Sequence, residues 1–333
     1  MYREGVFMVN YAVIGSGWRA EFYLRIAKLV PEVFCVTAMC VRNDEKAKYF
    51  ENKYGVKTFR TVEETLKEKS DFAVVCINKQ DIAQMALEVA DRGTFVLCET
   101  PIMLPKNEGK HNYDKIQVAE QFHLKGTFAA IKKIIDEGII GNISSIDVSC
   151  CHDYHAVSLV RFFLGDGVEP EKMCQYTLDD KVLKTHGRTG ELVEKEITTG
   201  TRIIRMYKFG NVSVLYNHSK EQYFSPIRKN RFIIRGTRGE IEDNTVRYFN
   251  ENNQFVQSEI KHEMCGNLDG FFNNKITFEN RVLYEYPYNS SRLSEEETAI
   301  AACLTGMKEY IESGKEMYSF ERAYKDYELC CFE

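Results

Sequence analysis

The first 125 or so residues alternate short apolar runs with segments of helical periodicity. "NYAVIG" (10–15), "DFAVVCIN" (71–78) and "TFVLCET" (94–100) are compact, β-rich runs. Because the run at 71–78 is apolar at successive positions, it indicates a strand covered by helices on both faces. Residues 82–90 carry apolar side chains at helical spacing, followed by Gly93. We predict an α/β fold, a Rossmann-type doubly wound parallel sheet with right-handed crossovers.

After residue 126 the pattern changes to longer strands in which polar and apolar positions alternate. "ISSIDVSC" (143–150), "GTRIIRMYKF" (200–209) and "NVSVLYNHS" (211–219) are examples, and turn residues separate several of them. A last helix is predicted to begin at a capping box formed by Ser294 and Glu297. We therefore predict two domains: a doubly wound parallel-sheet domain at 1–124, and at 125–333 an α+β domain with a large, mostly antiparallel open sheet.

Composition and charge exclude several classes of protein. The chain has 44 basic and 49 acidic residues and a net charge of -5, with no basic tract, which argues against nucleic acid as a partner. No apolar run approaches the ~20 residues that cross a bilayer, so no membrane association is expected. The N-terminus lacks a small-residue cleavage site and is not expected to be a secretory signal. Most of the 11 cysteines lie in apolar patterns typical of buried thiols, so we expect a cytoplasmic protein.

The clearest chemical motif is "VIGSGWRA" (13–20), which follows a predicted strand and opens a predicted helix. Gly15 permits a tight turn and Gly17 lets the backbone approach a pyrophosphate, which the free N–H groups of the helix would hold. Ser16, Trp18 and Arg19 complete the predicted cofactor-binding loop. The alternative interpretation is an ordinary tight turn.

The end of the second strand bears on which dinucleotide binds. An acidic residue about 20 positions after the loop would grip the ribose 2′-hydroxyl of NAD, but Val41 and Arg42 stand there. Arg42 could pair with a 2′-phosphate, which favours NADP over NAD. That Arg42 is simply solvated remains the alternative.

Four segments together resemble one known family. They are "VIGSGWRAEFYLRIAKLVPE" (13–32), "GTFVLCETP" (93–101), "IIDEGIIGNISSIDVS" (134–149) and "HAVSLVRFFLG" (155–165), in matching order and spacing over nearly the whole chain. The resemblance is to the Gfo/Idh/MocA family of nicotinamide-dependent oxidoreductases. It implies that residues 1–124 form an NAD(P)-binding Rossmann domain and that residues 125–333 form a substrate-binding and oligomerisation domain. It also implies a carbohydrate-like or polyol substrate, and a homodimer or homotetramer formed through the C-terminal sheet.

The resemblance also shows where the catalytic groups have changed. The family's strand end reads Glu-Lys-Pro, with the lysine transferring a proton, but here Glu99, Thr100 and Pro101 occupy those positions. The family's aspartate four residues before a histidine is replaced by Cys151, and only His155 is retained. A threonine hydroxyl is too weak an acid to replace lysine, so we expect the imidazole of His155 to transfer the proton. Tyr154 and Thr100 would orient the reacting oxygen.

Further cofactor contacts follow from position in the resemblance. Asn78 and Lys79 lie in the loop after one strand, Glu99 ends the next, and Gln121 would face the nicotinamide or substrate. Lys79 could supply the missing ammonium or be a solvated loop residue. Cys150 and Cys151 neighbour His152 and Asp153, yet adjacent residues of a strand point to opposite faces, so no metal site is predicted.

The sequence thus supports two functions. The first is an NAD(P)-dependent oxidoreductase acting on a carbohydrate-like or polyol substrate, with redox-assisted elimination or epimerisation as close variants. The second is a non-catalytic NAD(P)-binding sensor or regulator on the same fold, which the loss of lysine and aspartate favours. The intact loop and the retained His155 favour the enzyme.

Overall fold

The computed structural model describes residues 8–107, 109–165, 167–185, 196–266, 270–288 and 291–332. Residues 1–7, part of the N-terminal stretch in which no secretory signal is expected, lie outside the described residues. The chain divides into two compact units, the first comprising Met1–Gly126, Met264–Asn274 and Glu285–Glu328, and the second Thr127–Glu263, Lys275–Tyr284 and Leu329–Glu333. The predicted functional boundary between residues 124 and 125 remains a prediction, and the units differ from it in placing two C-terminal segments with the first.

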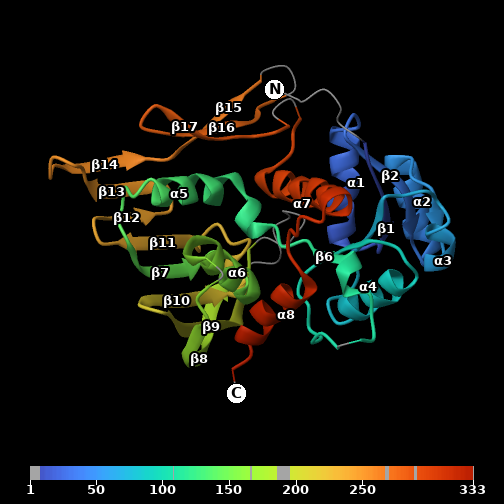
Figure 1. The fold of residues 1–333 in the computed structure, drawn as a ribbon, viewed down its shortest axis with the longest axis horizontal. Coiled ribbons are helices and arrows are strands. Elements are labelled where there is room, and N and C mark those ends of the chain that lie inside the picture. The colour runs from blue at the N-terminus through green and yellow to red at the C-terminus, as the bar shows by residue number, and fades with distance from the viewer. Residues whose placement is uncertain are drawn as a thin grey trace. The chain divides into compact units, whose positions relative to one another are not determined.

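The first unit is built on a six-stranded parallel sheet in the order β3-β2-β1-β4-β5-β6. Strands β1, β2 and β6 of this sheet are labelled in Figure 1. Its strands are β1 (Val9–Ile14), β2 (Phe34–Cys40), β3 (Thr58–Phe59), β4 (Phe72–Val75), β5 (Val96–Cys98) and β6 (Ile116–Val118). The chain winds outward from β1 to β3, then returns to the other side of β1 at β4. This reversal is the topological switch point, where doubly wound sheets bind ligands, and the predicted fold class is confirmed.

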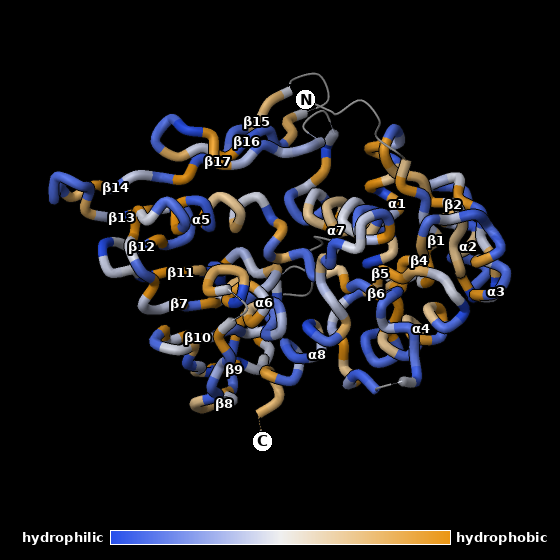
Figure 2. The backbone as a smooth tube through the Cα atoms, viewed as in Figure 1, coloured by the Kyte–Doolittle hydropathy of each residue, from blue (hydrophilic) through white to orange (hydrophobic). Residues whose placement is uncertain are grey.

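Helices cover this sheet on two faces. They are α1 (Trp18–Leu29), α2 (Asp44–Tyr54), α3 (Val62–Thr65), α4 (Ile82–Asp91), α7 (Glu295–Ser313) and α8 (Phe320–Leu329), with the short turns η1 (Tyr113–Lys115) and η2 (Phe122–Leu124). Because side chains alternate along a strand, Phe72 and Val74 of β4 join one core with α1 and α7, whereas Ala73 and Val75 join another with α4 and α8. The hydrophobic colour concentrates on central strands such as β4 and β5 (Figure 2).

The helix at Glu295–Ser313 begins at Ser294, and both hydrogen bonds of the predicted capping box are present. It is not the last helix, however, because α8 follows it. Phe320 and Ala323 of α8 are buried in the second core. The sequence did not reveal α8 because its remaining positions are mostly polar.

The second unit contains an eight-stranded sheet in the order β14-β13-β12-β11-β7-β10-β9-β8. The strands are β7 (Ile143–Ser149), β8 (Pro170–Leu183), β9 (Ile197–Phe209), β10 (Val212–Ser219), β11 (Arg231–Gly236), β12 (Gly239–Glu242), β13 (Thr245–Phe249) and β14 (Phe255–Glu259). Only β7 and β10 pair in parallel among these described strands, so the predicted mostly antiparallel sheet is confirmed. Helices α5 (Gly126–Asp136) and α6 (Asp153–Leu164) and the short turn η3 (Lys220–Gln222) accompany it.

A further three-stranded sheet joins β15 (Lys261–Cys265), β16 (Phe272–Phe278) and β17 (Arg281–Glu285) in that order. Among the described residues, no helix is both long enough and apolar enough to span a bilayer.

Candidate functional site

The predicted cofactor residues of the first unit gather at one edge of the parallel sheet. Each follows the carboxyl end of a strand: residues 15–19 after β1, Arg42 after β2, Asn78 and Lys79 after β4, residues 99–100 after β5, and Gln121 after β6. Parallel strands present all their carboxyl ends at the same edge. The topology therefore brings the predicted cofactor residues to one edge of the sheet.

Gly15 occupies a position that no other residue fits. Its φ is +137°, and a Cβ added there would lie 2.3 Å from the carbonyl oxygen of Cys76, at the end of β4. The Gly15 N–H also donates to the Cys40 carbonyl at the end of β2 (3.4 Å). The loop is consequently wedged between three strand ends, as a tight phosphate-binding turn requires.

Gly17, unlike Gly15, has open space around it. It is the N-cap of α1, has φ of -85° and is exposed, and an added Cβ would meet nothing within 4 Å. No side-chain hydrogen bond caps this helix end, and an uncapped helix N-terminus favours an anion. The open space above Gly17 is what a pyrophosphate would need, and the loop residues fit a dinucleotide.

Arg19 ties the loop to the end of β5. Its Nε lies 3.5 Å from a Glu99 carboxylate oxygen and its Nη1 lies 2.9 Å from Glu296 in α7. The Tyr23 hydroxyl donates to Glu99 at 2.6 Å, and Glu99 is only 5% exposed. Burial opposes ionisation of Arg19, but the carboxylates of Glu99 and Glu296 hold its pKa above its usual value. Burial, reinforced by Glu99, raises the pKa of Tyr23, which stays a neutral donor.

Two more contacts complete this part of the site. The Arg19 guanidinium lies 5.3 Å from the ring centroid of Trp18 and 5.1 Å from that of Phe22. Gln121 is 1% exposed, and in the amide orientation that satisfies both neighbours it accepts from Arg19 Nη2 (3.3 Å) and donates to the Ala119 carbonyl (2.8 Å). Arg19, Glu99 and Gln121 thus form one hydrogen-bonded network below the loop.

Other predicted cofactor residues are solvated. Arg42, Asn78 and Lys79 are exposed, and Thr100 is half-buried beside Glu99. Lys46, in the first turn of α2, reaches the loop: its Nζ donates to the Ser16 carbonyl at 3.4 Å. Sequence reasoning missed Lys46, although it stands four residues after Arg42.

In the second unit, the predicted catalytic residues lie where β7 leads into α6. His152 is the N-cap of α6, and Tyr154 and His155 occupy its first turn. His155 is 4% exposed, and its ring centroid lies 4.4 Å from that of Tyr154. Cys151 is fully buried, and its carbonyl accepts from the Tyr216 hydroxyl at 3.3 Å. Tyr154 and His155 are therefore neighbouring rings at the start of one helix.

A buried ion pair fixes the start of α6 on the sheet. Arg205 of β9 is 5% exposed; its Nη1 donates to Asp153 (2.7 Å) and its Nε to Gln175 (2.6 Å). Burial opposes ionisation of Arg205, but Asp153 raises its pKa overall. Charge-assisted contacts of this kind hold the first turn of α6, and with it His155, in one orientation.

Sequence reasoning also missed Tyr23, Glu296, Gln175 and Arg205, which support the predicted residues from elsewhere in the chain. Glu296 is 277 positions from Arg19, and no local pattern signals such a pairing.

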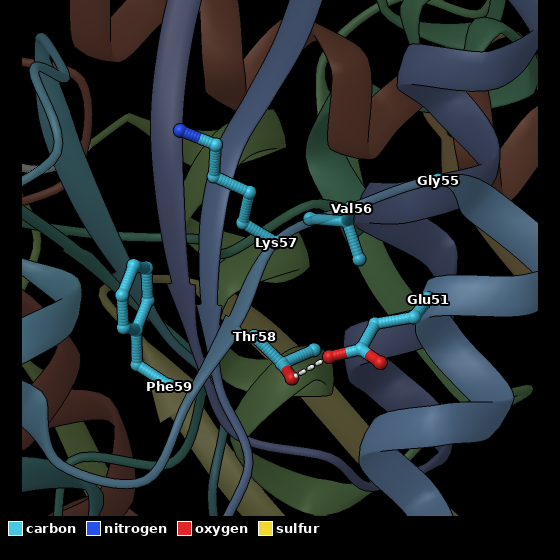
Figure 3. A pocket seen from close by; sticks show the side chains of 6 residues that line it. All are labelled: Glu51, Gly55, Val56, Lys57, Thr58 and Phe59. Carbon is cyan, nitrogen blue, oxygen red and sulfur yellow. Dashed lines mark hydrogen bonds between the residues drawn. The ribbon is translucent and has the colours of Figure 1, made fainter.

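A shallow depression of about 480 Å³ lies elsewhere in the first unit, between the end of α2 and the start of β3 (Figure 3). Thr58 donates to Glu51 across it, and Gly55, Val56, Lys57 and Phe59 complete its lining. It contains none of the predicted site residues.

The parallel sheet, the switch point and the open glycine loop define a Rossmann-type dinucleotide-binding protein. Residues 9–135 match the model of the Gfo/Idh/MocA oxidoreductase family with an NAD-binding Rossmann fold. This segment is therefore similar to the family that the sequence resemblance indicated.

Two curated relatives are similar to the chain. Oxidoreductase P35 of Formosa agariphila is 28% identical over 149 residues, covering 42% of this chain and 46% of that protein, so the match spans less than half of the relative. Levoglucosan dehydrogenase of Pseudarthrobacter phenanthrenivorans is 22% identical over 295 residues, covering 72% of this chain and 74% of that protein.

Solved structures share the whole fold. An Agrobacterium radiobacter oxidoreductase in complex with NAD+, L-tartaric acid and magnesium has a TM-score of 0.66 at 14% identity, covering 97% of this chain and 94% of that one. A levoglucosan dehydrogenase with NADH and levoglucosan has a TM-score of 0.65 at 16% identity, covering 96% and 94%. At these identities the likeness establishes the fold alone.

Proposed function

We propose that this protein is an NAD(P)-dependent oxidoreductase that acts on a carbohydrate-like or polyol substrate. The observation that carries the proposal is the glycine loop at the switch point, wedged at Gly15 and open at Gly17. The family match supports the redox class, and the similarity to levoglucosan dehydrogenase supports the substrate class.

The chemistry requires a proton and a hydride to move together. The nicotinamide, when bound, accepts or donates the hydride. His155 takes the proton from, or returns it to, the substrate oxygen, a role worth roughly 10²–10⁴ in rate. Tyr154 and Thr100 orient that oxygen. Transient formation of a ketone by the same residues would acidify a neighbouring C–H, which extends the proposal to elimination or epimerisation.

We further propose that NADP is preferred over NAD. Arg42 is exposed beyond the end of β2, and Lys46 lies against the glycine loop at Ser16, so two cations flank the place where a 2′-phosphate would lie. Arg42→Ala is expected to raise the Kd for NADP about tenfold, because one charged hydrogen bond is lost, and to leave the Kd for NAD unchanged. Lys48→Ala, another exposed cation of α2, is the control. A lower Kd for NAD than for NADP in the unaltered protein would refute this preference.

The activity itself is tested by incubating the protein with NAD or NADP and a panel of sugars and cyclic polyols. A change in nicotinamide absorbance with one of them is the expected result. Tight dinucleotide binding with no absorbance change across the panel would instead support the alternative, a sensor on the same fold that has lost the family's lysine and aspartate. Thr100→Lys, which restores the family's amine, would then be assayed with the same panel. Activity in this variant would indicate that the site keeps the ordinary family geometry, and continued inactivity would indicate that the geometry has diverged.

Two wider proposals accompany this function. A homodimer or homotetramer would form through the eight-stranded sheet of the second unit. A cytoplasmic location is proposed from the eleven cysteines, all of which are free thiols.

A further inference from the structure

His218, near the end of β10, is a buried polar side chain that the proposed reaction does not use. Its side chain is 3% exposed, and among the described residues its Nε2 has no hydrogen-bond partner. A buried polar nitrogen without a partner costs about 1–3 kcal/mol, and such groups in native proteins call for an explanation. A ligand that supplies the missing partner would remove that cost.

Two aromatic rings lie close to the His218 ring. The His152 ring lies 5.8 Å from the His218 ring at 75°, and the Tyr216 ring lies 6.2 Å from it at 35°. His152 in turn stacks on Tyr223, with centroids 5.6 Å apart and planes within 7° of parallel. The rings of His152 and Tyr216 thus neighbour the His218 ring, and the Tyr223 ring lies against His152.

Hydrogen bonds tie the segment before Tyr223 to the end of β7. Gln222, next to Tyr223, donates to the Ser149 carbonyl (2.7 Å) and hydroxyl (3.1 Å) at the end of β7, and to the Lys229 carbonyl (3.1 Å). His152 follows the same strand end and caps α6. The segments that carry the two rings are therefore linked through the end of β7.

The charge of this cluster favours an uncharged ligand. Burial, with a contribution from His152, lowers the pKa of His218 to about 4, against the opposing effect of Asp153. His218 is accordingly neutral at pH 7, and its Nε2 can donate to or accept from a hydroxyl but cannot supply a cation to a carboxylate. Arg205, the cation that reaches Asp153, is already bound by Asp153 and Gln175.

We propose that His218 and the stacked rings of His152 and Tyr223 form a recognition subsite for a cyclic, uncharged polyol. His218 would bond one hydroxyl of the ligand, while the aromatic rings would pack against the apolar C–H surface of its ring. His152 stands three residues before His155, so the subsite adjoins the segment that carries the proposed proton transfer. The inference rests on the proposed function, because it names the substrate class of that same site.

The test measures binding and turnover separately in the dinucleotide-loaded full chain. Binding of levoglucosan, myo-inositol and L-tartrate is followed by saturation-transfer NMR, and KM and kcat by nicotinamide absorbance. His218→Phe is expected to raise KM, or Kd, for the cyclic polyols about tenfold, since a substrate hydroxyl loses its partner, while dinucleotide affinity stays within twofold. L-tartrate, an acyclic dianion, is expected not to compete.

Matched variants serve as controls for misfolding and for nonspecific effects of the substitution. His218→Gln keeps a polar group near the Nε2 position and is expected to retain most of the affinity. His262→Phe, an exposed histidine of β15, should change nothing. Tyr223→Phe should bind normally and Tyr223→Ala weakly, which tests the subsite even where His218→Phe fails to fold.

The outcomes distinguish failure of the subsite from failure of the proposed oxidoreductase activity. The subsite would be overturned if the protein does not bind cyclic polyols, or if it binds them more weakly than L-tartrate. It would also be overturned if His218→Phe and Tyr223→Ala leave the binding of cyclic polyols unchanged. Binding that depends on His218 without any nicotinamide absorbance change would uphold the subsite and overturn the proposed oxidoreductase activity instead.

Discussion

At the residue scale, the network of Arg19 and Glu99 makes a direct prediction about stability. Arg19→Met leaves the carboxylate of Glu99, 5% exposed, with the Tyr23 hydroxyl but no cation. We expect the free energy of unfolding to fall by about 3 kcal/mol, because an uncompensated buried charge is costly. Urea unfolding followed through Trp18, the only tryptophan of the chain, measures the first unit.

The control is Arg60→Met, which removes a solvated pair with Asp44 whose side chains are 43% and 79% exposed. It is expected to cost less than about 1 kcal/mol. Adding Glu99→Gln to Arg19→Met should recover much of the lost stability, since the buried charge is then gone. Equal losses for Arg19→Met and Arg60→Met would contradict the role given to the network.

At this scale, some of the site residues could be predicted from the sequence and others could not. Gly15 and Gly17 were predicted because the loop motif is local and its backbone requirements are specific. Glu296 was not, because its contact with Arg19 depends on how α7 packs against α1. His218 offered no signal either: a histidine in an alternating strand gives no indication that its Nε2 lacks a partner.

At the element scale, two substitutions in the β1–α1 loop are expected to act on different properties, one on stability and the other on dinucleotide affinity. Gly15→Ala would force a Cβ to within 2.3 Å of the Cys76 carbonyl oxygen at a φ of +137°, so we expect at least about 2 kcal/mol of destabilisation. Gly17→Ala meets nothing and should fold normally, yet its methyl would occupy the space of a pyrophosphate. We expect it to raise the dinucleotide Kd at least about tenfold.

Urea unfolding gives the stability of both variants, and energy transfer from Trp18 to bound dihydronicotinamide gives their affinity. Normal dinucleotide binding by a folded Gly17→Ala protein would place the pyrophosphate elsewhere and remove the basis for the cofactor site.

Elements were predicted best where the apolar pattern is strong, on both faces of a strand or on one face of a helix. The central strands β1 and β4 and the helix α7 were predicted for this reason. The start of α7 was also predicted, from its capping box. Strand β8 was missed because most of its positions are exposed or half-buried, so tertiary pairing with β9 determines its conformation. Helix α8 was missed for the same reason: few of its residues face the core.

At the scale of the whole molecule, the outer face of the eight-stranded sheet predicts self-association. Met206 pairs with Cys174, and Ile204 pairs with Tyr176, so these side chains share one face. Tyr176 is 60% exposed, Leu178 47% and Met206 44%. Apolar surface of this kind is typical of an interface. Met206→Lys is expected to convert the oligomer to monomer, as measured by light scattering after size exclusion.

Tyr49→Lys, which changes a 46% exposed aromatic on α2, is the control and should leave the assembly intact. A monomeric unaltered protein at micromolar concentration would show that this sheet face serves another purpose.

We propose that His155 has taken over the proton transfer that lysine performs in the Gfo/Idh/MocA family. The most direct test compares nicotinamide reduction by the unaltered protein and by His155→Ala, with a cyclic polyol that the former oxidises and with His262→Ala as control. We predict that kcat falls by roughly 10²–10⁴ in His155→Ala alone, while the dinucleotide Kd stays within twofold. Full turnover by His155→Ala would contradict the claim.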